Sequence, residues 1–329
     1  MKYGEFIYLS RSDVEKCGIT WEQSLEVSEK TYSEHCKGNY EMPPKPGVHP
    51  TNCPGAFLHA MPGYLPGIDM CGMKWVGVFG HNKKKYSIPA LSSLIILNDV
   101  ETGYPVAVME GGLITAIRTG QGSAVGAKYL SREDSQVLGV VGAGEQGRNN
   151  VMAICNVRPS IKKVKLYDLY PEFCQGLIDT VSPDLPGVEF EICDSAEAAI
   201  RNSDIIVTAA PLTVEGAVYQ AEWVKPGALV VPVHMHGWAW DFCASHKVVV
   251  DDWNQFSNYM FGPGKYWADR WEMYAQLGDV INGTVVGREN DEEIIINMNL
   301  GIALQDISLG KKVLEIAKEK GLGQTLSLY

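Results

Sequence analysis

Residues 137–148 combine an apolar run with a glycine-rich turn. The run, Val137–Val141, is short and fully apolar, which is typical of a buried strand, and a helix-compatible stretch follows the turn. In such a turn Gly142 permits a sharp reversal, Gly144 lets a pyrophosphate approach the backbone, and Gly147 allows the helix to pack closely on the strand. The helix N-terminus favours the phosphate charge. The pattern predicts a dinucleotide site made by Gly142, Ala143, Gly144, Glu145, Gln146 and Gly147.

An acidic residue follows at the position that determines which of the two nicotinamide dinucleotides, NAD or NADP, is bound. Asp168 ends the next apolar run, about 20 residues after Gly147, which makes a coincidental glycine turn less plausible than a cofactor site. A carboxylate there accepts hydrogen bonds from a ribose 2′-hydroxyl and repels a 2′-phosphate. Leu169 and Tyr170 supply no cation that would reverse this preference. NAD is therefore the expected cofactor, in preference to NADP.

Short apolar runs separated by helix-length segments continue beyond this turn. The expected strands are Val137–Val141, Val164–Tyr167, Phe190–Ile192, Ile205–Thr208, Leu229–Val233 and Val248–Val250. Alternating strands and helices of this kind predict an α/β fold with a doubly wound parallel sheet.

The first third of the chain has a different pattern. Thr20 and Gln23 form a capping box at the start of an amphipathic helix, whereas residues 41–72 are dense in Pro and Gly and are expected to form loops. A helix is expected over 113–130, whose three glycines mark either a break or close packing. Strands are expected at Lys74–Phe79, Leu91–Leu97 and Val106–Met109. These elements predict a first domain that contains a sheet.

Composition and charge exclude several classes of protein. Apolar residues make up 46% of the chain and charged residues 20%, as in packed globular proteins. The net charge of −11 repels nucleic-acid phosphates and anionic lipid, so neither nucleic acid nor membrane is an expected partner. The eight cysteines form no CxxC pair, so we expect reduced thiols in a cytoplasmic protein and no metal site.

Several further motifs run in order through most of the chain. They are Lys74-Trp-Val-Gly, Asn98-Asp-Val-Glu-Thr-Gly-Tyr-Pro105, Leu113-Ile-Thr-Ala-Ile-Arg118-Thr119, Ala127-Lys-Tyr-Leu130, Gly142-Ala-Gly144, Val249-Val-Asp-Asp252, Leu277-Gly-Asp279, Gly287-Arg288 and Leu300-Gly-Ile-Ala-Leu-Gln-Asp306. In this order they resemble the ornithine cyclodeaminase/mu-crystallin family. The resemblance implies a Rossmann domain, expected over 119–299, inserted into a smaller α+β substrate-binding and dimerisation domain, expected over 1–118 and 300–329. A homodimer is therefore expected.

The resemblance also implies roles for individual residues. Lys74 and Arg118 match the family's cations that hold and polarise the carboxylate end of the substrate, and Lys45 lies where the family presents an Arg. A guanidinium offers a bidentate grip on a carboxylate, and an ammonium adds a point charge and can exchange a proton. Without the resemblance, Lys74 would be interpreted as a strand-edge surface residue and Arg118 as a helix salt-bridge residue. Further cofactor contacts are expected at Thr119, Thr208 and Ala209.

Two histidines follow the expected strand Leu229–Val233, at the sheet edge where ligands bind in open α/β folds. His236 lies near the position of the aspartate that handles the second amine in cyclodeaminases, and Ala90 replaces a cyclodeaminase hydroxyl. We expect His236 to exchange a proton with an imine nitrogen, with a pH profile that bends between about 6 and 8. The alternatives are a structural histidine or a metal shared with His234, for which no third ligand follows.

A group of aromatic residues follows these histidines. Core or interface packing is the expected role, and an aromatic substrate wall is the alternative. The tryptophans are Trp238, Trp240, Trp253, Trp267 and Trp271.

Three functions remain open at this point. The favoured one is an NAD-dependent oxidoreductase that acts on the C–N bond of an α-imino or α-amino acid, as an imine reductase, an amino acid dehydrogenase or an opine-type dehydrogenase. The second is an ornithine cyclodeaminase-type lyase with catalytic NAD, against which His236 argues. The third is a ligand-binding protein of the mu-crystallin kind without turnover. Each implies a small amino or imino acid ligand.

Overall fold

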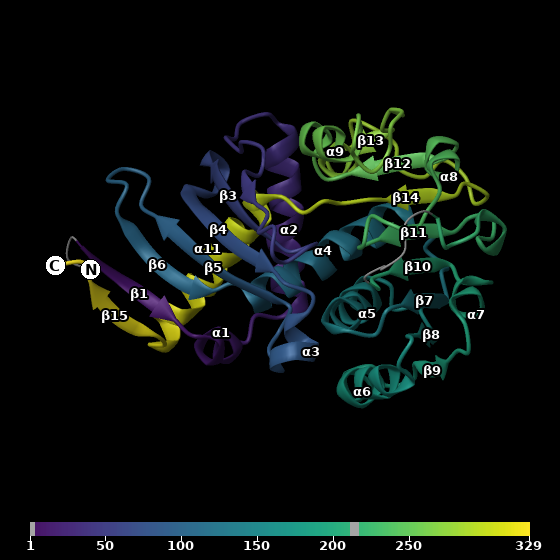
Figure 1. Cartoon of the computed structure of the whole chain (residues 1–329), viewed down its shortest axis with the longest axis horizontal. Coiled ribbons are helices and arrows are strands. Elements are labelled where there is room, and N and C mark those ends of the chain that lie inside the picture. The colour runs from purple at the N-terminus through teal and green to yellow at the C-terminus, as the bar shows by residue number, and fades with distance from the viewer. Residues whose placement is uncertain (1–3, 211–216) are drawn as a thin grey trace. The chain divides into compact units, whose positions relative to one another are not determined.

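The computed structural model describes residues 4–210 and 217–329. The chain divides into two compact units, of which the first contains the residues up to Arg118 together with Ile302–Tyr329, and the second contains Thr119–Gly301 (Figure 1). Across the described residues, no helix combines the length and the apolar character that crossing a bilayer requires.

The first unit is built on a mixed sheet. Its strands are β1 (Glu5–Leu9), β2 (Gly47–Val48), β3 (Phe57–Leu65), β4 (Met70–Val78), β5 (Leu91–Asn98), β6 (Pro105–Glu110) and β15 (Gln324–Ser327). In the described part of the unit the strand order is β15-β1-β6-β5-β4-β3-β2. Strands β1 and β6 are parallel, and the other neighbours are antiparallel. The last strand of the chain thus pairs with the first.

Helices cover one face of this sheet. They are α1 (Arg11–Cys17), α2 (Trp21–Cys36) and α11 (Ala303–Lys320), while the short α3 (Asn82–Tyr86) lies in the connection between β4 and β5, and a 3-10 turn spans Pro66–Ile68. The capping box of Thr20 and Gln23 is formed at the start of α2, and Ser10 and Asp13 form a second one before α1. The long helix α11 packs against the sheet, and its apolar residues share a core with those of β4, β5 and β6.

The expectation of loops over 41–72 is wrong for β3. This strand runs through Pro62 and Gly63, and Pro62 lies opposite Met73 of β4. A Cβ added at Gly63 would lie 3.0 Å from a methyl carbon of Leu304 and 3.2 Å from one of Ile307. The glycine therefore makes room for α11 instead of ending the strand, because only a residue without a side chain allows so close an approach.

The second unit contains a parallel sheet. Its strands are β7 (Val137–Val141), β8 (Lys163–Tyr167), β9 (Glu189–Ile192), β10 (Ile205–Thr208), β11 (Leu229–Pro232), β12 (Lys247–Val250), β13 (Ala275–Gln276) and β14 (Ile295–Asn297). Among the described residues the order is β13-β12-β14-β11-β10-β7-β8-β9, with every pair parallel. The expected α/β fold with a doubly wound sheet is confirmed, and the expected strands lie within one residue of the observed bounds.

Helices lie on both faces of the parallel sheet (Figure 1). They are α4 (Gly112–Leu130), α5 (Glu145–Val157), α6 (Pro171–Val181), α7 (Ala196–Ile200), α8 (Trp240–Ala244), α9 (Trp253–Met260) and α10 (Leu277–Ile281), with 3-10 turns at Ser182–Asp184 and Ala221–Trp223. Next to Gly139 of β7 lies α7, while α5 lies near Val140, whose side chain points to the opposite face.

Helix α4 is continuous through its glycines, so close packing is the correct alternative. A Cβ at Gly120 would lie 2.8 Å from the carbonyl oxygen of Asn149, and one at Gly126 would lie 2.0 Å from Nδ2 of Asn297. Both glycines therefore allow α4 to lie directly against its neighbours.

The tryptophan-rich segment mainly forms core. Trp238, Trp267 and Trp271 are buried in the core of the second unit, while Trp253 is half-buried and Trp240 is exposed. Core packing is therefore the role that the structure supports for the three buried rings.

Candidate functional site

The glycine-rich turn has the geometry that its sequence predicts. Strand β7 ends at Val141, and Gly142 adopts a φ of +100°, a conformation that a side chain would strain. A Cβ at Gly147 would lie 2.0 Å from the carbonyl oxygen of Gly142, so this residue must be glycine for α5 to begin here. A Cβ at Gly144 would meet nothing within 4 Å. The space beside Gly144 is thus open, as a phosphate-binding turn requires.

Asp168 lies beside this turn. Its carboxylate accepts a hydrogen bond from the backbone N–H of Ala143 at 2.8 Å and one from the N–H of Tyr170 at 3.1 Å. Gly144, the N-cap of α5, provides no side-chain acceptor for the N–H groups of the first helical turn. Backbone donors and a carboxylate therefore lie side by side where β7 and β8 end, an arrangement that suits a pyrophosphate and a ribose.

The other residues expected to contact the cofactor have different surroundings. The N–H of Ala209 donates to the carbonyl oxygen of Val141 at 2.7 Å, which places the end of β10 against the turn. The hydroxyl of Thr208 is buried and accepts from Nε1 of Trp238 at 3.2 Å, so it faces the core. Thr119 is half-buried on α4, one residue before Gly120 packs on α5.

A buried group of charges lies in the first unit. Lys74 comes from β4, Arg118 from α4 and Asp306 from α11. Nζ of Lys74 lies 2.7 Å from Oδ2 of Asp306, and Nε of Arg118 lies 3.0 Å from Oδ1 of the same carboxylate. The exposed fraction of the side chain is 1% for Lys74, 0% for Asp306 and 12% for Arg118. One carboxylate thus holds two cations away from water.

The surroundings of Lys74 and Asp306 lower the pKa values of both side chains. Burial, followed by the repulsion of Arg118, lowers the pKa of Lys74 from 10.5 to about 7, although Asp306 acts in the opposite direction. Burial alone would raise the pKa of Asp306, but Arg118 and Lys74 outweigh it and hold that pKa below its usual value. At neutral pH the Asp306 carboxylate is charged, while the Lys74 amine is poised to gain or lose a proton.

Asp306 belongs to this buried group of charges, although the sequence analysis predicted no role for it. A signal was present, because Asp306 precedes Ile307 on the apolar side of the last helix. Charged residues are rarely buried without a partner. An aspartate among buried apolar residues of a helix therefore indicates a cation elsewhere in the fold.

Lys45 lies in the same unit, two residues before β2. It contributes to lowering the pKa of Lys74, so the two ammonium groups are within electrostatic reach of each other. Lys45 is half-buried. The structure therefore brings all three predicted substrate-binding cations together, because Lys45 and Arg118 both lie within electrostatic reach of Lys74.

His234 and His236 follow β11 in the second unit. The ring of His236 is exposed and meets Tyr266 edge-on, with centroids 4.3 Å apart. Partial desolvation lowers the pKa of His236 from its ordinary value of 6.5, and burial followed by the neighbouring His236 lowers that of His234. Both imidazoles are therefore mainly neutral at pH 7.

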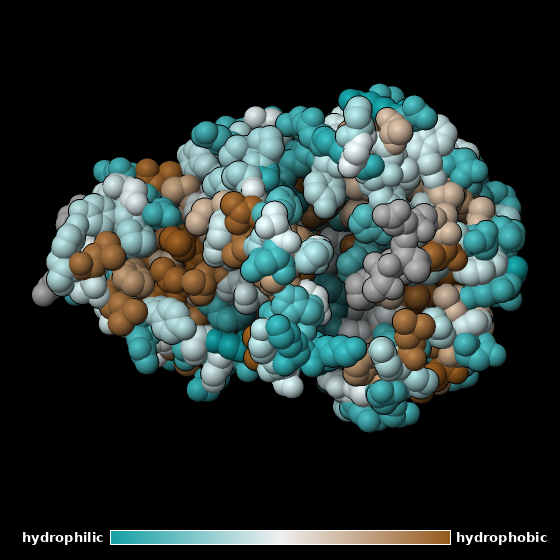
Figure 2. All heavy atoms as spheres, in the orientation of Figure 1, coloured by the Kyte–Doolittle hydropathy of each residue, from teal (hydrophilic) through white to brown (hydrophobic). Residues whose placement is uncertain are grey.

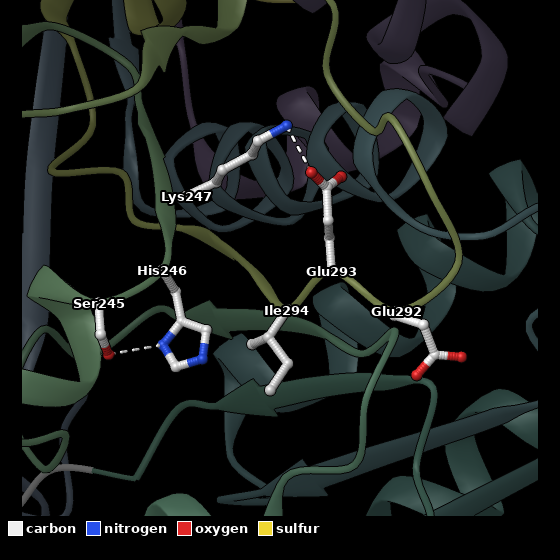
Figure 3. Close-up of a pocket in the computed structure, with 6 residues that line it drawn as sticks. All are labelled: Ser245, His246, Lys247, Glu292, Glu293 and Ile294. Atoms are coloured by element: carbon white, nitrogen blue, oxygen red, sulfur yellow. Dashed lines mark hydrogen bonds and ion pairs between the residues drawn. The ribbon is translucent and has the colours of Figure 1, made fainter.

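A shallow pocket on the second unit is not part of this site (Figure 3). It is lined by Ser245, His246, Lys247, Glu292, Glu293 and Ile294. Lys247 is the first residue of β12, and Ile294 directly precedes β14, so the pocket lies at the amino ends of parallel strands. Ligands of open α/β sheets bind at the carboxyl ends. Lys247 and Glu293 also neutralise each other in an ion pair at 2.7 Å, so neither charge needs a ligand.

The chain is similar to several known proteins over nearly its whole length. The chain is 37% identical to the nodulation efficiency protein NfeD of Rhizobium meliloti, over 97% of this chain and 98% of that protein. Its structure is similar to that of the Delta(1)-pyrroline-2-carboxylate reductase of Thermococcus litoralis in complex with NADH and L-proline, with a TM-score of 0.88, 31% identity, and coverage of 98% and 100% of the two chains. An archaeal alanine dehydrogenase dimer with bound NAD gives a TM-score of 0.86, 30% identity, and coverage of 99% and 100%.

The match to a family model covers nearly the same part of the chain as these similarities. It matches residues 6–321, which include the glycine-rich turn of the second unit and the buried charges of the first. The order of motifs from Lys74 to Asp306 therefore reflects common descent of the whole chain. The protein belongs to the ornithine cyclodeaminase/mu-crystallin family.

Proposed function

We propose that this protein catalyses NAD-dependent oxidoreduction at the C–N bond of an α-imino or α-amino acid. The buried group of Lys74, Arg118 and Asp306 is the observation that carries the proposal. With both basic groups protonated, one carboxylate faces two cations, so the group has an excess positive charge that can hold the α-carboxylate of a substrate. The reductase and the dehydrogenase named above have substrates of this chemistry.

Arg118 is suited to hold that carboxylate. Its ion pair with Asp306 uses Nε, and among the described residues its two terminal nitrogens make no hydrogen bond. A guanidinium can grip a carboxylate with two parallel N–H donors. Asp306 thus fixes the plane of the guanidinium, and Lys45 adds a third cation nearby.

The residues of the second unit fit NAD. The open space at Gly144 and the N–H groups that begin α5 suit the pyrophosphate, and Asp168 suits the ribose hydroxyl groups. Thr119 and Ala209 complete the set that we assign to the cofactor, whereas the buried hydroxyl of Thr208 faces the core. When bound, NAD accepts or supplies a hydride at the substrate α-carbon.

Lys74 is the first candidate for moving the proton. A pKa of about 7 leaves the amine partly protonated at neutral pH, so Lys74 can donate a proton to an imine nitrogen or accept one from an ammonium. His236 is the second candidate. Its lowered pKa makes it mainly neutral at pH 7 and therefore a poorer proton donor than Lys74.

A spectrophotometric screen tests the function. NADH oxidation at about 340 nm would be followed for 2-oxo acids offered together with ammonia or small amines, and we expect turnover of at least one pair. Ornithine tests the alternative cyclodeaminase function. We expect no turnover of ornithine, because His236 takes the place of the carboxylate that binds the second amine of ornithine in cyclodeaminases. Conversion of ornithine to proline with release of ammonia and no net change in NADH would contradict the proposal.

Arg118→Lys tests the grip on the carboxylate. The variant keeps the charge but loses the planar fork, so we expect kcat/KM to fall by about 10²-fold, with NADH affinity nearly unchanged. NADH binding is measured by fluorescence titration. Lys128→Arg, on the last turn of the same helix, is the matched control and should behave as the wild type. Equal activity of wild type and Arg118→Lys would remove Arg118 from the site.

We further propose that the protein is a homodimer joined through the outer face of its mixed sheet. Tyr8, Val108, Ile96, Met73 and Pro62 lie in one row across that face, and all are half-buried. Figure 2 shows apolar residues gathered over this part of the first unit. Apolar patches at the surface mark interfaces, and the archaeal alanine dehydrogenase is a dimer.

A cytoplasmic location fits these assignments. All eight cysteines lie in the described part of the chain, and none of them forms a disulfide. Reduced thiols are typical of proteins from reducing compartments.

A further inference from the structure

His59 lies on the same face of the mixed sheet as Lys74. In the antiparallel pairing of β3 with β4, Met61 is opposite Lys74 and His59 is opposite Val76. Residues two apart on a strand point to the same face. His59 is therefore one row away from Lys74, at roughly 7 Å along the strand.

The ring of His59 is held in place by its neighbours. It stacks on Phe57 with centroids 4.3 Å apart, and His49 meets it edge-on at 5.9 Å. Gly47 of β2 lies opposite His59, and a Cβ added there would be only 2.3 Å from Cδ2 of the imidazole. The absence of a side chain at Gly47 thus gives the His59 ring its position.

Basic groups converge on this position. Burial lowers the pKa of His59, and Lys45, His49 and Lys74 lower it further. Lys45 also acts on Lys74, so it is within electrostatic reach of both rows. Exposure increases from buried Lys74 through half-buried His59 to exposed His49. A line of basic side chains therefore runs outward from the candidate carboxylate site, and an anion bound between them would favour their protonated, cationic forms.

We propose that His49 and His59, together with Lys45, form a second anion subsite, and that the substrate is an α-imino acid with a second anionic group, a carboxylate, on the substituent that reaches these residues. This inference rests on the proposed function, because it assumes that Lys74 and Arg118 hold the α-carboxylate. The spacing of about 7 Å between the rows suits a substituent of a few methylene groups. The second carboxylate belongs either to the carbon chain of the 2-oxo acid or to the amine that forms the imine.

Ligand binding tests the subsite without turnover. Succinate and butyrate have the same chain length and differ by one carboxylate. We expect succinate to bind at least about tenfold more tightly than butyrate, a factor that corresponds to about 1.4 kcal/mol. Calorimetry with the NADH-loaded protein measures both affinities. Equal affinities would overturn the inference, whatever the result of the activity screen.

Two variants locate the effect. His59→Asn removes the imidazole, and Gly47→Ala pushes it from its place, so each should reduce the preference for succinate over butyrate severalfold. The matched control is His81→Asn, in the exposed loop between β4 and β5, and it should keep the preference of the wild type. An unchanged preference in correctly folded His59→Asn and Gly47→Ala would overturn the assignment to His59.

Turnover then identifies the source of the second carboxylate. One comparison uses 2-oxoglutarate against 2-oxopentanoate with ammonia, and the other uses β-alanine against propylamine with pyruvate. We expect kcat/KM to be at least about tenfold higher for the doubly charged member of one comparison. NADH oxidation without such a preference in either comparison would overturn the inference. Selective binding of succinate without any NADH oxidation would support the subsite and contradict the proposed function.

Discussion

At Lys74, burial and a neighbouring guanidinium act in the same direction. Both disfavour the ammonium, and the Asp306 carboxylate only partly offsets them. An amine whose pKa lies near neutrality can take part in proton transfer, which an ordinary surface lysine cannot do at pH 7. We therefore assign Lys74 to proton transfer, in addition to the proposed contact with the substrate carboxylate.

The pH profile distinguishes the two candidate proton donors. If protonated Lys74 donates to the imine nitrogen, kcat/KM for reduction should fall as pH rises through about 7. If His236 donates, the fall should come at a pH below 6.5, because its pKa is lowered. We expect the bend near 7, and we expect His236→Asn to retain it. Loss of the bend in His236→Asn would assign the proton to His236.

We propose that Asp168 sets the preference for NADH over NADPH. Asp168→Ala should weaken NADH binding by about 1–3 kcal/mol, the scale of hydrogen bonds to charged groups, and should reduce the preference for NADH over NADPH. Fluorescence titration with both dinucleotides measures this. Asp179→Ala, at an exposed position of α6, is the control and should bind as the wild type does. Better use of NADPH than of NADH by the unmodified protein would contradict the assignment.

At the scale of elements, glycines in helices have different roles. Gly126 of α4 has no room for a side chain, whereas a Cβ at Gly176 of α6 would meet nothing within 4 Å. Both positions are helical, so intrinsic helix propensity acts equally on them. The difference lies in tertiary packing alone.

Two alanine substitutions test this difference. Gly126→Ala should lower the free energy of unfolding by about 1–3 kcal/mol, because the Cβ overpacks against Asn297. Gly176→Ala should raise it by about 0.5–1 kcal/mol, the usual gain in helix propensity. Urea denaturation measures both. An increase in the free energy of unfolding on Gly126→Ala would contradict this expectation and would show that α4 can move away from Asn297.

The strands of the first unit illustrate a limit of prediction at this scale. Dense Pro and Gly over 41–72 indicate loops by local rules, yet β3 forms because it has β4 as a partner along its whole length. Its pairing is non-local, and no pattern within the segment encodes it. The central strands β7, β10 and β11 are predictable from the sequence because their short apolar runs are almost wholly buried.

At the scale of the molecule, the outer face of the mixed sheet should control assembly. Ile96→Glu places a charge in the centre of the apolar row, and we expect a shift from dimer to monomer in sedimentation velocity. Val286→Glu, at an exposed apolar residue of the second unit, is the control and should remain dimeric. A monomeric wild-type protein would contradict the proposed interface.

By itself, the sequence determined the parallel sheet, the glycine-rich turn, the expected NAD and the family, because these depend on short runs and fixed spacings. Only the tertiary structure decided that Asp306 pairs with Lys74 and Arg118, and that His59 lies one row from Lys74. These groups come from segments far apart in the chain. Their burial and mutual distances, which set their pKa values and their chemistry, exist only once the strands have paired and the last helix has packed on the sheet.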